Sequence, residues 1–158
     1  MQLIEYDKKY HDQVVALILD IQNNEAKIAL SLEQQPDLYD IERSYMDKGG
    51  NFWLALDEND RVIGTIGVLN KGNGYGILKK FFVQVEYRSQ KVGLQLYQAL
   101  QAFCVAKGFK VLILDTPAVA KASHRFYEKN DFTQITSKDL PIPYKFPDRD
   151  SLLYLKKL

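Results

Sequence analysis

The chain has 158 residues, of which 46% are hydrophobic and 26% are charged, and its formal net charge is +1. This length fits a single domain, residues 1–158, with a real hydrophobic core. The small net charge argues against a nucleic acid or an anionic membrane as partner, and no apolar run approaches the roughly 18 residues that cross a bilayer. The first residues lack an apolar signal-peptide core, and the one cysteine cannot form an internal disulfide, so we expect a cytoplasmic protein.

The first half of the chain is predicted to hold a strand, two helices and three further strands. Residues 2–6 form a short strand candidate, and an amphipathic helix follows from Tyr10 to about Asn24, because its apolar residues recur at helical spacing. A second helix is predicted from about Leu38 to Lys48, where two glycines end it. Three strands separated by turns then lie within the stretches NFWLALDEND, RVIGTIGVLN and YGILKKFFV, and we expect them to pair antiparallel.

The second half alternates helices with strands. After the stretch YRSQKVGL, a helix is predicted to run to about Lys107, where Gly108 closes it. The continuous apolar run KVLILDT is typical of a strand that is buried on both faces, which favours a parallel pairing. A helix (AVAKASHRFYEKND), a strand (FTQI), a proline-interrupted loop (LPIPYKFPDRD) and a last strand (SLLYLKKL) complete the chain. This order predicts an α/β fold in which one mixed sheet of about seven strands has helices on both faces.

Two local patterns accompany this order of elements. The fourth predicted strand is followed by Arg88-Ser89-Gln90-Lys91-Val92-Gly93, and the helix before the strand FTQI ends in Tyr127-Glu128-Lys129-Asn130-Asp131-Phe132. With the element order over roughly residues 1–135, they resemble the GNAT superfamily of acetyl-CoA-dependent N-acetyltransferases. That family's pyrophosphate loop reads Gln/Arg-x-x-Gly-x-Gly/Ala, and its later helix ends in a phrase like Tyr-Glu-Lys-x-Gly-Phe. The resemblance implies a GNAT-like sheet that is splayed between strands four and five.

The resemblance also implies that acetyl-CoA binds at this splay as a cosubstrate. The pantetheine arm would pair with Phe81, Phe82 and Val83, and the pyrophosphate would meet the helix dipole and the backbone N–H groups of Ser89, Gln90, Lys91, Val92, Gly93 and Leu94. Three roles stay open for Arg88: a fork to phosphate, a contact that pins the loop, or a solvated surface charge. Three residues depart from the family pattern, since Lys91 and Asp131 stand where glycines are usual and Ala120 replaces an asparagine that contacts the pantetheine.

The family reaction is the attack of a neutral amine on the thioester carbonyl, which needs a proton donor for the leaving thiolate and an acceptor for the amine proton. Tyr127 matches the family's donor, although its spacing alone also fits a core aromatic residue. Asp115 is the candidate base or else caps the turn after its strand, and Gly76 to Lys80 offers no carboxylate. His124 is a proton shuttle or a capping group, and Cys104 is interpreted as a buried thiol rather than a nucleophile. The two histidines and one cysteine make no metal site.

The acceptor is expected to be a small-molecule or peptide amine. Its wall would come from the first two helices, their loop and the late loop, where four acids either attract a cation or remain ordinary surface groups: Glu25, Glu33, Asp37 and Asp148. Among relatives, homodimers often form through the sheet edges. Two other functions stay open. A non-catalytic acyl-CoA-binding module is favoured by Lys91 and the missing glutamate, whereas a nucleoside-triphosphate enzyme would need a Gly-Lys-Ser/Thr ending that is absent here.

Overall fold

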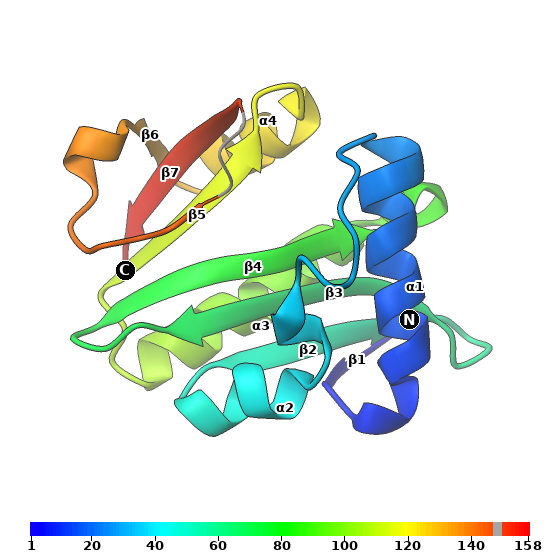
Figure 1. Ribbon diagram of the computed structural model, residues 1–158. Coiled ribbons are helices and arrows are strands. Elements are labelled where there is room, and N and C mark those ends of the chain that lie inside the picture. Colours follow the sequence, from blue (N-terminus) through cyan, green and yellow to red (C-terminus); the bar gives the residue numbers. More distant parts are fainter. Residues whose placement is uncertain (147–149) are drawn as a thin grey trace.

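The computed structural model describes residues 1–146 and 150–158. Within these residues, one seven-stranded sheet has the order β1-β2-β3-β4-β5-β7-β6 (Figure 1). Its strands are β1 (Gln2–Glu5), β2 (Asn51–Leu56), β3 (Val62–Asn70), β4 (Tyr75–Val83), β5 (Val111–Pro117), β6 (Thr133–Ile135) and β7 (Ser151–Lys157). Neighbouring strands are antiparallel except β4 and β5, which are parallel. The predicted α/β fold with a mixed sheet is therefore confirmed.

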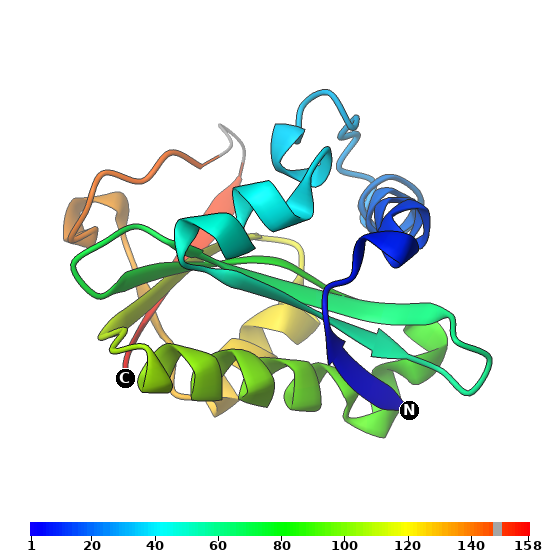
Figure 2. The ribbon, with the colours of Figure 1, turned by 90° about the horizontal axis from the view of Figure 1, so that it is seen from below.

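Helices cover both faces of the sheet. Two helices, α1 (His11–Asp20) and α2 (Ile41–Ser44), lie on one face, and two others, α3 (Val92–Ala106) and α4 (Lys121–Lys129), lie on the opposite face (Figure 2). A π-helical turn (Ile21–Glu25) extends α1, and 3₁₀ turns occupy Lys8–Tyr10, Pro36–Leu38, Met46–Lys48, Val85–Gln90 and Ser137–Asp139. None of the described helices is long and apolar enough to cross a membrane.

The two faces of the sheet hold separate hydrophobic clusters. The cluster under α3 and α4 includes Leu96, Leu100 and Tyr127, and the cluster under α1 and α2 includes Ile18, Tyr45 and Phe52. Burial of the apolar line of α3 confirms the helical spacing that predicted it.

The predicted helix from Leu38 to Lys48 is broken, and the prediction of a continuous helix was wrong. The side chain of Asp40 accepts a hydrogen bond from the Arg43 backbone N–H at 3.1 Å, so α2 begins only at Ile41. Helix α2 ends at Tyr45, where φ is −111°, and a 3₁₀ turn follows. Tyr45 is fully buried, with its ring 5.1 Å from the ring of Phe52 and its hydroxyl 2.6 Å from Asp37 Oδ2. Tertiary packing of this one side chain therefore overrides the local helical pattern.

The predicted splay lies between β4 and β5. In the described chain these strands pair only from Tyr75 to Ile77, although β4 stays paired with β3 as far as Val83 and β5 stays paired with β7 as far as Pro117. The two strands visibly diverge in Figure 1. The register of β3 with β4 also shifts beyond Lys79, and Lys80 takes a positive φ of 55°. The far half of β4 therefore presents an unpaired edge towards β5 and contains a bulge.

Candidate active site

The loop predicted to hold a pyrophosphate joins the free end of β4 to the start of α3. It consists of the 3₁₀ turn Val85–Gln90 and then Lys91, the N-cap residue of α3, whose side chain caps nothing. The first backbone hydrogen bond of α3 runs from Gln95 N–H to the Lys91 oxygen at 3.1 Å, so the N–H groups of the first helical turn, residues 92–94, point out of the helix end. Such an end carries partial positive charge and is suited to an anion.

Both residues that replace family glycines adopt the left-handed conformation. The φ angle is 61° at Lys91 and 70° at Asp131, and Lys91 is exposed. This conformation costs a residue with a Cβ atom about 1–2 kcal/mol relative to the right-handed one, and glycine avoids that cost. Lys91 and Asp131 therefore adopt the left-handed backbone conformation for which glycine is favoured.

The structure favours a pinning role for Arg88 among the three that the sequence left open. Its Nε donates to the Val83 carbonyl at 2.9 Å, and its guanidinium forms an ion pair with Glu25. The two side chains are 42% and 40% exposed. Because Glu25 ends the π-helical turn after α1, the pair joins that turn to the loop between β4 and α3.

The three strand residues predicted to pair with pantetheine lie on the unpaired half of β4. Phe81 and Val83 turn their side chains towards the cluster under α3, whereas Phe82 packs against the cluster under α1. Their backbone edge towards β5 is left without a strand partner in the described chain. The backbone can therefore accept an extended ligand while the side chains stay in the two cores.

Tyr127 combines a packed ring with a hydroxyl that has no hydrogen-bond partner among the described residues. The residue is 6% exposed, and its ring centroid lies 6.3 Å from that of Phe81 and 5.5 Å from that of Phe132. Burial and, next, the charge of Asp115 raise the pKa of Tyr127, so the phenol keeps its proton.

Asp115 lies on the β5 side of the splay, where its carboxylate accepts a hydrogen bond from the hydroxyl of Tyr144. The turn after β5 closes through backbone atoms, with Ala120 N–H 3.0 Å from the Pro117 oxygen, so Asp115 does not cap it. Ala120 is the N-cap residue of α4 and makes no side-chain hydrogen bond. Burial and the charge of Asp115 raise the pKa of Tyr144, a residue of the late loop that the sequence analysis did not single out.

The other two candidates, His124 and Cys104, are both buried. His124 is buried, and its Nε2 lies 2.9 Å from the Pro117 oxygen, which ties α4 to the end of β5. Cys104 is buried as predicted, and burial raises the pKa of its thiol to about 12, so the nucleophilic thiolate is disfavoured. No group of three or more metal-ligating side chains occurs in the described part of the chain.

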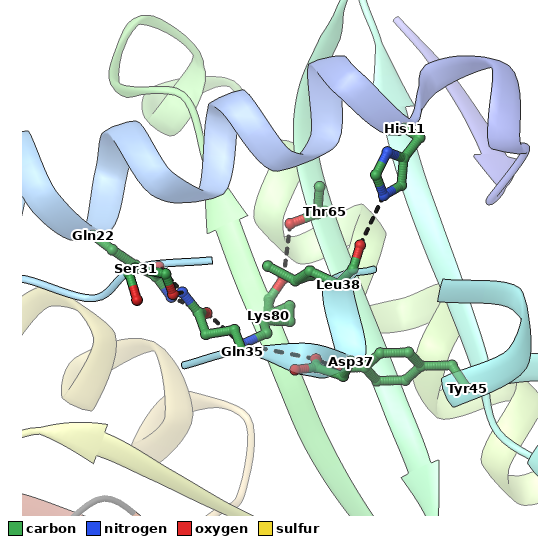
Figure 3. Close-up of polar contacts among 9 residues, drawn as sticks. All are labelled: His11, Gln22, Ser31, Gln35, Asp37, Leu38, Tyr45, Thr65 and Lys80. Carbon is green, nitrogen blue, oxygen red and sulfur yellow. Dashed lines mark hydrogen bonds and ion pairs between the residues drawn. The ribbon is translucent and has the colours of Figure 1, made fainter. Parts of the chain in front are cut away.

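The face of the splay towards α1 holds a polar network that the sequence analysis missed. The Lys80 ammonium lies 2.6 Å from Gln35 Oε1 and 3.8 Å from Asp37 Oδ2 (Figure 3). Gln22 and Gln35 exchange two amide hydrogen bonds of 2.9 and 2.8 Å. The one sequence feature that could have indicated this network is the charged pair Lys79-Lys80 inside an otherwise apolar strand. The direction of the Lys80 side chain depends on a bulge in β4, and the sequence does not predict that bulge.

The four acids predicted to line the acceptor site have different surroundings. Glu25 and Asp37 are engaged as described, Glu33 is exposed, and Asp148 lies outside the described residues. Two surface hollows, one lined by Tyr10 and Asp60 and the other by His11 and Asp40, contain none of the predicted site residues.

Comparisons with known proteins agree with this geometry. A crystal structure of an acetyltransferase from Streptococcus agalactiae is 41% identical, with a TM-score of 0.94 over 99% of this chain and 98% of that one. The probable N-acetyltransferase camello of Xenopus tropicalis is 30% identical over 108 residues, which are 66% of this chain and 49% of that protein. The chain therefore spans about half the length of the curated relatives it matches.

A more distant structure shares the fold alone. The PaiA N-acetyltransferase of Thermoplasma acidophilum, solved in complex with coenzyme A, is 17% identical with a TM-score of 0.78 and covers 99% of this chain and 98% of its own. The model of the acetyltransferase (GNAT) family matches residues 15–132. With the splayed sheet, the open helix end and the relatives of the same fold, this match shows that the chain belongs to the GNAT family of acetyltransferases.

Proposed function

We propose that this enzyme transfers the acetyl group of acetyl-CoA to a primary amine, by direct attack while both substrates are bound. The observation that carries the proposal is the parting of β4 from β5 immediately before the uncapped start of α3. The unpaired edge of β4 is followed along the chain by the open N-terminus of α3. The strand edge can pair with the amides of an extended ligand, and the helix end can bind its phosphates.

The residues present fit coenzyme A. The backbone of Phe81–Val83 would hold the pantetheine amides, and the N–H groups of residues 89–94 would hold the pyrophosphate. The exposed ammonium of Lys91 adds positive charge to that end, while Arg88 fixes the loop. When bound, the coenzyme supplies the acetyl thioester. The coenzyme A complex of the Thermoplasma relative supports this choice of ligand.

The proton balance of the reaction assigns roles to two residues. The acceptor ammonium first loses a proton, because only the neutral amine is a nucleophile. Its nitrogen then bonds to the carbonyl carbon, the carbon–sulfur bond breaks, and the departing sulfur takes a proton from the enzyme. The nitrogen, which is cationic after the attack, releases a second proton, and this proton replaces the one given to the sulfur. Tyr127 is the proposed donor, since its hydroxyl is protonated and has no partner among the described residues. Asp115, with Tyr144 hydrogen-bonded to it, is the proposed acceptor of the amine proton.

A ligand-binding measurement and a turnover measurement together test this function. Acetyl-CoA at a thousandfold excess over its Kd stabilises a fold by about 4 kcal/mol through mass action, so we expect a clear thermal shift with acetyl-CoA and none with ATP. A panel of amines should then produce free thiol. Equal shifts with both nucleotides, or with neither, would contradict the proposal. Binding of acetyl-CoA without thiol release from any amine would favour the non-catalytic acyl-CoA-binding module instead.

A further inference from the structure

Lys80 is a charged residue in a position where the sheet is otherwise apolar. It belongs to the half of β4 that β5 leaves unpaired, and its side chain is only 9% exposed. Its backbone takes the left-handed conformation, with φ at 55°, which is disfavoured for a residue with a Cβ atom. A buried charge in a strained conformation beside an unpaired strand edge is typical of a functional group rather than of a solvated surface lysine.

The ammonium group of Lys80 is held from the side of α1. Gln35 Oε1 accepts from it at 2.6 Å, and Gln35 is oriented by its paired hydrogen bonds with Gln22 (Figure 3). Both glutamines are 4% exposed. Because the π-helical turn after α1, the segment before α2 and β4 each contribute one of these residues, the network fixes the direction in which Lys80 points.

A carboxylate stabilises this cation at longer range. Asp37 Oδ2 lies 3.8 Å from the Lys80 nitrogen, beyond hydrogen-bond distance, while it accepts the Tyr45 hydroxyl at 2.6 Å. Burial is the largest cause that raises the pKa of Tyr45, and the charge of Asp37 is the next. Lys80 therefore lies beside polar groups of the segment before α2, on the face of the sheet covered by α1.

We propose that Lys80 binds a carboxylate of the acceptor, and that the acceptors are free amino acids. This inference rests on the proposed N-acetyltransferase function. Lys80 directly precedes Phe81–Val83, the backbone proposed to hold the pantetheine arm, so a carboxylate beside its ammonium would keep the amine of a small molecule close to that arm. A peptide N-terminus has a neutral amide at that position. The bond changes are those already given, and the carboxylate itself is unchanged.

Matched pairs of acceptors test the inference. Each free amino acid is compared with its own carboxamide, which keeps the amine and the side chain but loses the negative charge. We measure kcat/KM from thiol release with acetyl-CoA, and we expect the acids to exceed their amides at least tenfold, as is typical when a charge-assisted hydrogen bond is lost. The variant K80M should remove this preference, and K80R should keep most of it. K79M, which removes a neighbouring lysine of the same strand, should leave the preference unchanged and is the matched control.

The outcomes separate this inference from the proposed function. Transfer to amides as fast as to acids, or a preference for acids that survives in K80M, would overturn the carboxylate subsite and leave the acetyltransferase intact. An equal loss with acids and amides in K80M, together with a lower Tm, would assign Lys80 a purely structural role. Absence of acetyl-CoA binding in the parent protein would contradict the proposed function itself. A binding readout needs no turnover: with coenzyme A present, N-acetyl amino acids should raise the Tm of the parent more than N-acetyl amino acid amides do.

Discussion

Replacing Tyr127 by phenylalanine separates its two interpretations, proton donor and core aromatic. The ring packs against Phe81, Phe126 and Phe132, and phenylalanine fills nearly the same volume. The hydroxyl has no hydrogen-bond partner among the described residues, so its removal leaves no protein group there unsatisfied. We therefore expect the free energy of unfolding to change by less than about 0.5 kcal/mol.

The effect on turnover should be much larger. General acid catalysis typically contributes about 10²–10⁴-fold, or roughly 3–5 kcal/mol of barrier, so kcat for Y127F should fall by that factor. The affinity for acetyl-CoA should stay unchanged, because the hydroxyl would act only on the departing sulfur. The assay is thiol release at saturating acetyl-CoA with the best acceptor, together with calorimetric binding of acetyl-CoA.

The variant Y97F is the matched control. The Tyr97 hydroxyl donates to Gln101 at 2.6 Å and accepts from the Lys156 ammonium at 2.9 Å, on the face of the sheet covered by α3. Its removal should cost about 1–3 kcal/mol of stability and lower the Tm by several degrees, with kcat unchanged. Y127F should thus lose turnover and keep its stability, whereas Y97F should lose stability and keep its turnover. Turnover of Y127F within about threefold of the parent, with chemistry shown to be rate-limiting, would refute the proton-donor assignment.

Three further predictions concern the coenzyme loop, a turn and alkaline pH. Replacing Lys91 by glutamate should weaken acetyl-CoA binding at low salt, while the affinity of K91G stays within a few-fold of the parent. If calorimetry gives K91E the same affinity as the parent, Lys91 points away from the phosphates. The variant G50A should lose more than about 3 kcal/mol in urea unfolding or fail to fold, because its Cβ would lie 2.0 Å from the Val68 carbonyl oxygen; an unchanged urea midpoint would contradict this. Burial raises the pKa of both Tyr6 and Tyr154 to about 12, whereas the unfolded chain loses these protons near pH 10, so the free energy of unfolding should fall as the pH rises from about 10 to 12. A urea midpoint that stays constant across this range would contradict the shift.

The sequence alone predicted those features that depend on neighbouring residues. The apolar line of α3, the continuous apolar run of β5 and the glycine after α3 are local patterns, and the elements follow them. Asp131 stands where a glycine is usual and takes the left-handed conformation, which aspartate tolerates at modest cost.

The missed features join residues that lie far apart in the chain. Arg88 could not be assigned because its ionic partner, Glu25, is 63 residues away. Lys80 meets Gln35 over 45 residues, through a bulge that no residue type specifies. The break at Tyr45 likewise follows from its burial against Phe52, which local propensity cannot indicate. The fold and the divergence of β4 from β5 could thus be predicted, whereas the contacts of Arg88 and Lys80 could not.

The short ladder between β4 and β5 joins two parts of the sheet by few backbone contacts, and we expect these parts to open separately. In the described chain, three residue pairs join these strands, whereas seven join β5 to β7. Backbone amides of β4 beyond Ile77 that face β5 should therefore exchange with solvent quickly, although they lie near the middle of the sheet. A ligand laid along that edge supplies the missing partners. Acetyl-CoA is thus expected to slow hydrogen exchange in β4 and β5 together and to make the two parts of the sheet unfold as one cooperative unit.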